Sequence, residues 1–131
     1  FVLQRCIETR GAVLRVVVVY HQFLSYWRIN DNQKDFPVNT SRNAVIAPDA
    51  HPHLQARGIA AVKKFCANTG LNLGGLDIVF PELADDSEPL FLEINYYFGR
   101  RGLGGSEKFY ELLLCGIKQW LSDQNITVPT N

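Results

Sequence analysis

LRVVVVYHQFLSYWRI, residues 14–29, is the stretch that decides the fold. Two runs rich in β-branched and aromatic residues flank His21-Gln22, which is typical of a β-hairpin with a short turn. Counting outward from a two-residue turn at His21-Gln22 predicts that Arg15 lies directly opposite Arg28. The face that carries both arginines is predicted to carry four further residues as well: Val17, Val19, Leu24 and Tyr26.

The pair formed by Arg15 and Arg28 is interpreted as a clamp for an anion such as a polyphosphate. Like charges on facing positions destabilise a ladder unless a counter-ion lies between them. The alternative is that both guanidinium groups turn into water or pair with acids such as Glu8 or Glu93. The pattern therefore predicts a shared face and leaves its counter-ion open.

Further elements are predicted on both sides of this hairpin. They are a strand at 1–7, a long functional loop at 30–48, a helix from Pro52 to a stop at 68–70, strands at 76–80 and 90–95, an acidic connection at 82–88, and a helix capped by Ser106. This succession predicts an α+β fold, with a largely antiparallel sheet and helices packed on one face. Residues 1–123 are expected to form the domain and residues 124–131 a tail.

Composition restricts the classes of partner. The 131 residues are 47% hydrophobic, which is enough for one core, and 13 basic residues balance 13 acidic ones. That balance argues against a nucleic-acid or anionic-membrane partner. No apolar run approaches the roughly 20 residues of a membrane span, and no signal-peptide pattern opens the chain. Cys6, Cys66 and Cys115 lie in apolar segments, so we expect buried free thiols and a cytoplasmic protein.

Three oxygen-bearing side chains recur on two of the predicted strands. Because side chains alternate along a strand, Phe91, Glu93 and Asn95 are predicted to share one face. Asp77 is expected on the matching face of the preceding strand, with no lysine or arginine in either strand to neutralise the carboxylates. A hard cation is the usual remedy, and oxygen-only ligands favour magnesium. By spacing alone, a solvated face of a half-exposed sheet is the favoured alternative.

The order of Asp77 in Gly-Leu-Asp-Ile-Val-Phe and of Glu93 and Asn95 in Leu-Phe-Leu-Glu-Ile-Asn resembles the paired metal strands of ATP-grasp enzymes, particularly RimK-type glutamate ligases. The resemblance implies that Asp77, Glu93 and Asn95 bind two magnesium ions, with manganese as an alternative. It also implies that residues 1–123 are part of an ATP-grasp domain, its carboxyl-terminal subdomain. Because the chain has no methionine and opens in an apolar run, we expect an amino-terminal part of the same protein upstream of Phe1.

The resemblance extends upstream over most of the chain. Residues 3–7 are similar to the strand and hinge that contact adenine, residues 14–18 to the following arginine-bearing strand, and residues 36–42 to the Phe-x-x-Asn-x-x-Arg loop at the phosphates and acceptor carboxyl. With the hairpin argument, the expected nucleotide-binding residues are Arg5, Cys6, Arg15, Arg28, Pro37, Val38 and Asn39. Arg15 and Arg42 are the expected catalytic residues, and Arg42 is also expected to bind substrate.

A glycine-rich loop, residues 99–106, opens the last predicted helix. Free backbone N–H groups at such a position suit an anion, so Arg100 and Arg101 are candidates for binding a substrate carboxylate. A plain connecting loop is an equally good interpretation.

The function that the resemblance implies is ATP-dependent ligation of a carboxylate to an amine. ATP would phosphorylate the acid, and the amine would then displace phosphate to give an amide. The expected cofactors are ATP and magnesium. The expected partners are an acid, an amine and the upstream part of the same protein. Formation of a homo-oligomer is left open. The alternative is a non-catalytic nucleotide-binding or structural module, and the fragment alone is expected to be inactive.

Overall fold

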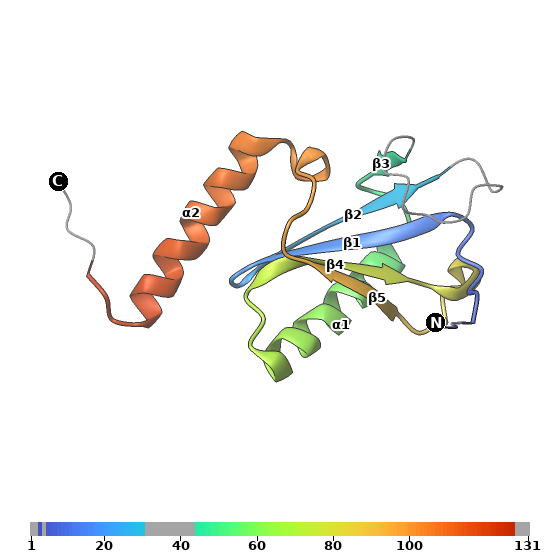
Figure 1. Cartoon of the computed structure of the whole chain (residues 1–131), viewed down its shortest axis with the longest axis horizontal. Helices are drawn as coiled ribbons and strands as arrows, with labels where there is room; N and C mark the ends of the chain where they lie inside the picture. Colours follow the sequence, from blue (N-terminus) through green and yellow to red (C-terminus); the bar gives the residue numbers. More distant parts are fainter. Residues whose placement is uncertain (1–2, 4, 31–43, 128–131) are drawn as a thin grey trace.

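A five-stranded antiparallel sheet forms the centre of the protein (Figure 1). The computed structural model describes residues 3, 5–30 and 44–127. The elements are β1 (Ala12–Val19), β2 (Gln22–Ile29), β3 (Val45–Ala47), α1 (Pro52–Thr69), β4 (Leu73–Val79), β5 (Leu90–Asn95) and α2 (Ser106–Asp123), with short 3-10 turns at Pro81–Leu83 and Arg101–Leu103. The spatial strand order is β3-β2-β1-β4-β5. The predicted α+β fold with an antiparallel sheet is confirmed.

The middle strand, β1, is buried along its whole length. It lies between β2 and β4, so its ladder hydrogen bonds are satisfied on both edges. Six of its eight residues are valine or leucine, and β-branched residues fit a pleated, buried surface. Arg15 is the charged residue in this strand, and it therefore needs a partner inside the protein.

Helix α1 covers one face of the sheet, whereas α2 contacts the opposite face through Phe109 and Leu113 and is exposed over most of its length, so the prediction that helices pack on one face is wrong. Helix α1 packs Leu54 and Val62 against Leu14, Val16 and Val18. The other face of the sheet forms a second cluster that includes Val17, Val19, Tyr26, Leu103 and Phe109. The physical reason is that β1 is apolar at both alternating sets of positions, and each apolar face must be covered.

Helix α2 lies at the hairpin-turn end of the sheet (Figure 1). The Gln22 side chain donates a hydrogen bond to the Leu112 carbonyl at 2.9 Å, and the Tyr20 hydroxyl donates one to Asp123 at 2.6 Å. A Cβ added at Gly116 would lie 3.0 Å from Val19, so glycine permits the close approach of this helix.

The hairpin register differs from the predicted one by two residues. The turn is at Tyr20-His21, and Arg15 pairs with Tyr26 instead of Arg28. Because side chains alternate with a period of two, a shift of two residues leaves every residue on its predicted face. The predicted sharing of one face by the two arginines is therefore confirmed, whereas their direct opposition is wrong.

Several local predictions are also corrected. Of the predicted first strand, the described residues 3 and 5–7 are not in a strand, whereas β3 forms inside the predicted 30–48 loop. Ser106 is the first residue of α2, and Gly105 occupies the N-cap, so Ser106 is not the cap. The predicted α1 is confirmed, and Gly70 ends it with a left-handed φ of 75°.

The exposure of the cysteines differs from the prediction. The three thiols are free, but Cys6 and Cys115 are exposed and only Cys66 is partly buried, so the expectation of buried thiols is wrong for two of them. Within the described part of the chain, neither helix combines the length and apolarity that crossing a membrane requires.

Candidate functional site

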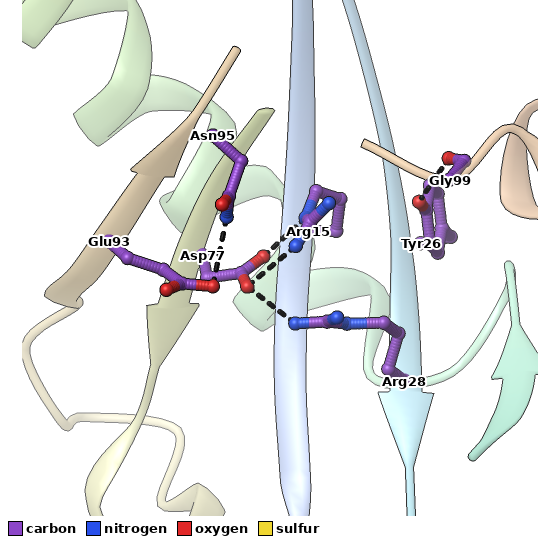
Figure 2. A network of polar contacts seen from close by, with 7 residues as sticks. All are labelled: Arg15, Tyr26, Arg28, Asp77, Glu93, Asn95 and Gly99. Carbon is purple, nitrogen blue, oxygen red and sulfur yellow. Dashed lines mark hydrogen bonds and ion pairs between the residues drawn. The ribbon is translucent and has the colours of Figure 1, made fainter. Parts of the chain in front are cut away.

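Four side chains form a row across four strands, on the face of the sheet away from α1 (Figure 2). Tyr26 on β2 lies opposite Arg15 on β1, and Arg15 lies opposite Asp77 on β4. Asp77 in turn lies opposite Glu93 on β5. Facing residues of an antiparallel ladder point to the same side, so the register alone brings these groups together.

Asp77 is held by two arginines at once (Figure 2). Arg15 donates from Nε to Oδ1 and from Nη2 to Oδ2, the second at 2.7 Å, and Arg28 donates from Nη2 to Oδ2. The Asp77 side chain is 1% exposed and that of Arg15 is 6% exposed, whereas that of Arg28 is 24% exposed. This is a buried, charge-assisted network with a bidentate core.

The electrostatics of Arg15 follow from this contact. Burial alone would lower the pKa of its guanidinium group, but the hydrogen bonds and charge of Asp77 outweigh burial and raise that pKa. Arg15 therefore stays charged, and its charge is compensated inside the fold.

The expectation that the carboxylates lack a cationic neighbour is wrong for Asp77. Lysine and arginine are indeed absent from β4 and β5, but Arg15 reaches Asp77 from the adjacent β1. Both arginines pair with an acid of the protein, as in the alternative to the anion clamp, but that acid is Asp77 and not Glu8 or Glu93.

Glu93 and Asn95 join Asp77 on the same face, as predicted. The Asn95 amide donates a hydrogen bond from Nδ2 to Glu93 Oε1 at 2.8 Å. Phe91 does not share this face, because a bulge in β5 leaves Leu92 without a facing residue on β4. Phe91 instead points toward α1, where its ring lies 5.3 Å from that of Phe65.

Tyr26 connects this row to the glycine-rich loop. Its hydroxyl donates a hydrogen bond to the Gly99 carbonyl at 3.4 Å, and a Cβ at Gly102 would overlap its ring. Burial raises the pKa of the Tyr26 phenol, although the charges of Arg15 and Arg28 oppose that rise. The sequence did not identify Tyr26 as a site residue, because the predicted register placed Arg28 opposite Arg15, where the structure has Tyr26.

Arg100 and Arg101 lie at a separate hollow of about 610 Å³, beside the first turn of α2. The Arg100 guanidinium lies 4.7 Å from the ring centroids of both Phe109 and Tyr110 and donates a hydrogen bond to Ser106 Oγ at 3.4 Å. Within the described residues, neither arginine forms a hydrogen bond or ion pair with the Asp77 row. The loop therefore approaches the row through Tyr26, not through its arginines.

The other predicted nucleotide-binding residues are not part of this arrangement. Arg5 and Cys6 are exposed and lie outside any strand. Pro37, Val38, Asn39 and Arg42 lie outside the described residues.

The donor set at Asp77, Glu93 and Asn95 fits magnesium in its chemistry, because all three offer oxygen. No cluster of three or more histidine, cysteine, aspartate and glutamate side chains gathers among residues 3, 5–30 and 44–127. The site thus offers two carboxylates and an amide, and one of the carboxylates is engaged by arginines.

Comparison with known protein families found no match, and a search of curated proteins found no relative.

Proposed function

We propose that this chain is the carboxyl-terminal subdomain of an ATP-grasp ligase that joins a carboxylic acid to an amine through an acyl phosphate. The supporting observation is the position of Asp77, Glu93 and Asn95 on one sheet face, beside Arg15 and Arg28. A set of oxygen ligands next to two guanidinium groups suits a metal–polyphosphate complex better than it suits either ion alone.

The residues of this site have different roles in the proposed reaction, according to their chemistry. Arg15 and Arg28 would bind phosphate oxygens, and Asp77, Glu93 and Asn95 would hold magnesium. When bound, magnesium neutralises phosphate charge, which is a main part of phosphoryl-transfer catalysis. Arg42 is assigned to the acyl phosphate, and Arg5, Cys6, Pro37, Val38 and Asn39 to the nucleotide. The assignment of Arg28 rests on the hairpin argument, and the others rest on the sequence resemblance.

The remaining parts of the proposal concern partners. In the family that the sequence resembles, two lysines of an upstream subdomain reach the ATP phosphates, and the upstream part of the same protein would supply them here. Arg100 and Arg101 would receive a substrate carboxylate in their hollow. A cytoplasmic location accompanies this function, because the reaction consumes ATP.

A second candidate is a structural or nucleotide-binding module without turnover. The observation that favours it is that three guanidinium N–H groups already occupy the carboxylate of Asp77. In that case the network would serve to join β1, β2 and β4.

The two candidates differ in ADP formation. The protein extended upstream of Phe1 is assayed for magnesium-dependent ADP release with a panel of amino acids and carboxylic acids, and Glu93→Gln is compared with Asp86→Asn. Asp86 is an exposed acid in the loop before β5, so its variant controls for the loss of one negative charge. Ligase function predicts substrate-stimulated ADP release that Glu93→Gln abolishes and Asp86→Asn preserves. Unchanged ADP release in Glu93→Gln contradicts the proposal.

A further inference from the structure

The carboxylate of Asp77 has almost no acceptor capacity left for a metal ion. A carboxylate offers about four lone-pair positions, and three are used here by N–H groups of Arg15 and Arg28. The side chain is 1% exposed, so water does not compete for the remaining position. A metal ion can use Asp77 only if one of the arginines leaves it.

Arg28 is the partner that can leave. It holds Asp77 through Nη2 alone, whereas Arg15 makes two hydrogen bonds and is nearly fully buried. Arg28 is also the more exposed arginine, with 24% of its side chain accessible. The Nε–H of Arg28 is buried and has no hydrogen-bond partner among the described residues. An incoming anion would accept a hydrogen bond from this N–H, which Asp77 does not do.

Charge balance adds a second reason for exchange. Arg15, Arg28, Asp77 and Glu93 sum to zero on this face. A divalent cation alone would leave an excess of two positive charges close to two guanidinium groups, which is unfavourable in a partly buried site. Phosphate groups that arrive with the cation remove that excess and give Arg28 a new acceptor.

We propose that Arg28 blocks Asp77 against metal ions until a polyphosphate draws its guanidinium group away. The blocked state and the metal-bound state of Asp77 then exclude each other, and metal and polyphosphate bind with positive coupling. This inference rests on the proposed function, since it takes Asp77 and Glu93 as the metal ligands. It gives Arg28 a positioning role. The metal ion reaches Asp77 only when the polyphosphate also binds.

The test measures manganese binding to the whole chain without any nucleotide, by the electron paramagnetic resonance signal of free manganese. Arg28→Gln removes the block and is expected to tighten manganese binding about 5-fold or more. Arg57→Gln is the matched control, because Arg57 is 26% exposed and its ion pair is with Glu88. The control is expected to leave the affinity unchanged.

The outcomes separate this inference from the proposed function. Manganese binding that is equal in the wild-type chain and in Arg28→Gln overturns the block and leaves the metal site standing. Absence of binding in both chains overturns the metal assignment and the block together. A gain that is shared by Arg57→Gln shows a general charge effect and also overturns the block.

A second measurement uses only the wild-type chain and therefore does not depend on the folding of a variant. Nitrogen-15 NMR follows the Nε–H resonance of Arg28, and carbon-13 NMR follows the carboxylate of Asp77. Magnesium alone is expected to leave both signals in place, and magnesium with tripolyphosphate is expected to move both. Movement of the Asp77 signal with magnesium alone, while Arg28 stays unchanged, overturns the block.

Discussion

Arg15 and Asp77 lie directly opposite each other in the β1–β4 ladder, and the guanidinium group of Arg15 donates two hydrogen bonds to the carboxylate. Both side chains are almost completely buried. Taking two charges out of water is expensive, and their attraction offsets that cost only when both are present. The pair is thus a structural requirement of the sheet whatever further role the face has.

Removing one member of the pair should be strongly destabilising. Arg15→Gln leaves the buried Asp77 with Arg28 as its single cationic partner, and we expect the free energy of unfolding to fall by about 3–5 kcal/mol. Urea denaturation of the chain, followed by circular dichroism, measures this. The comparison variant Arg57→Gln breaks an ion pair with the exposed Glu88 and a hydrogen bond to the Asp85 carbonyl, and it should change stability by about 1 kcal/mol at most. A loss in Arg15→Gln as small as that would show that the buried pair is not formed.

Gly102 should be intolerant of a side chain, because a Cβ there overlaps the ring of Tyr26. We expect Gly102→Ala to lower the free energy of unfolding by about 1–3 kcal/mol and to shift the aromatic NMR signals of Tyr26. Gly99→Ala is the matched control in the same loop, since a Cβ at Gly99 meets nothing within 4 Å. Equal effects of the two variants would mean that the loop does not rest on Tyr26.

Cys66 should react more slowly with an alkylating reagent than Cys6 and Cys115. Burial raises the pKa of the Cys66 thiol, so at a given pH less of it is in the reactive thiolate form. Cys6 and Cys115 are exposed and free. At about pH 8, near the ordinary thiol range, iodoacetamide should therefore modify Cys66 last, and its rate should keep rising at higher pH. Mass spectrometry of the labelled peptides measures the order, and labelling of Cys66 first would refute this placement.

The faces of β1, β2 and β4 could be predicted from the sequence, but the partners across them could not. Alternation along 14–29 placed Arg15 and Arg28 on one face, and that result survived a register error of two residues because the error was even. The contact of Arg15 with Asp77 depends on the pairing of β1 with β4, which lies far along the chain. Local periodicity contains no information about which strands become neighbours.

The same limit explains the errors about the helices and β5. Apolar periodicity predicted where α1 and α2 lie in the chain, but it did not show which face of the sheet each helix covers. A bulge adds one residue to one strand, and its position depends on the fit between two strands. The exposed Leu92 reads as an ordinary apolar strand residue in the sequence.

The bulge at Leu92 leads to a prediction that runs against the usual effect of a deletion. Ile78 faces Phe91 and Asp77 faces Glu93, so Leu92 is the extra residue between two regular pairs. Removing Leu92 should leave a continuous ladder in which Glu93 still faces Asp77. Leu92 is 48% exposed, so little buried apolar surface is lost, and we expect stability to change by about 1 kcal/mol or less.

Deletion of Ile94 is the matched control for deletion of Leu92, because Ile94 is 40% exposed and lies in the same strand. Ile94 faces Leu76, so its loss would move Asn95 into that position on the α1 side and break the hydrogen bond from Asn95 to Glu93. Urea denaturation and the cross-strand nuclear Overhauser effect between the Hα atoms of Asp77 and Glu93 distinguish the two deletions. We expect the nuclear Overhauser effect between Asp77 and Glu93 to persist without Leu92. We expect deletion of Ile94 to lower the free energy of unfolding more than deletion of Leu92 does. Loss of the Asp77–Glu93 contact on deletion of Leu92 would show that the bulge itself positions Glu93.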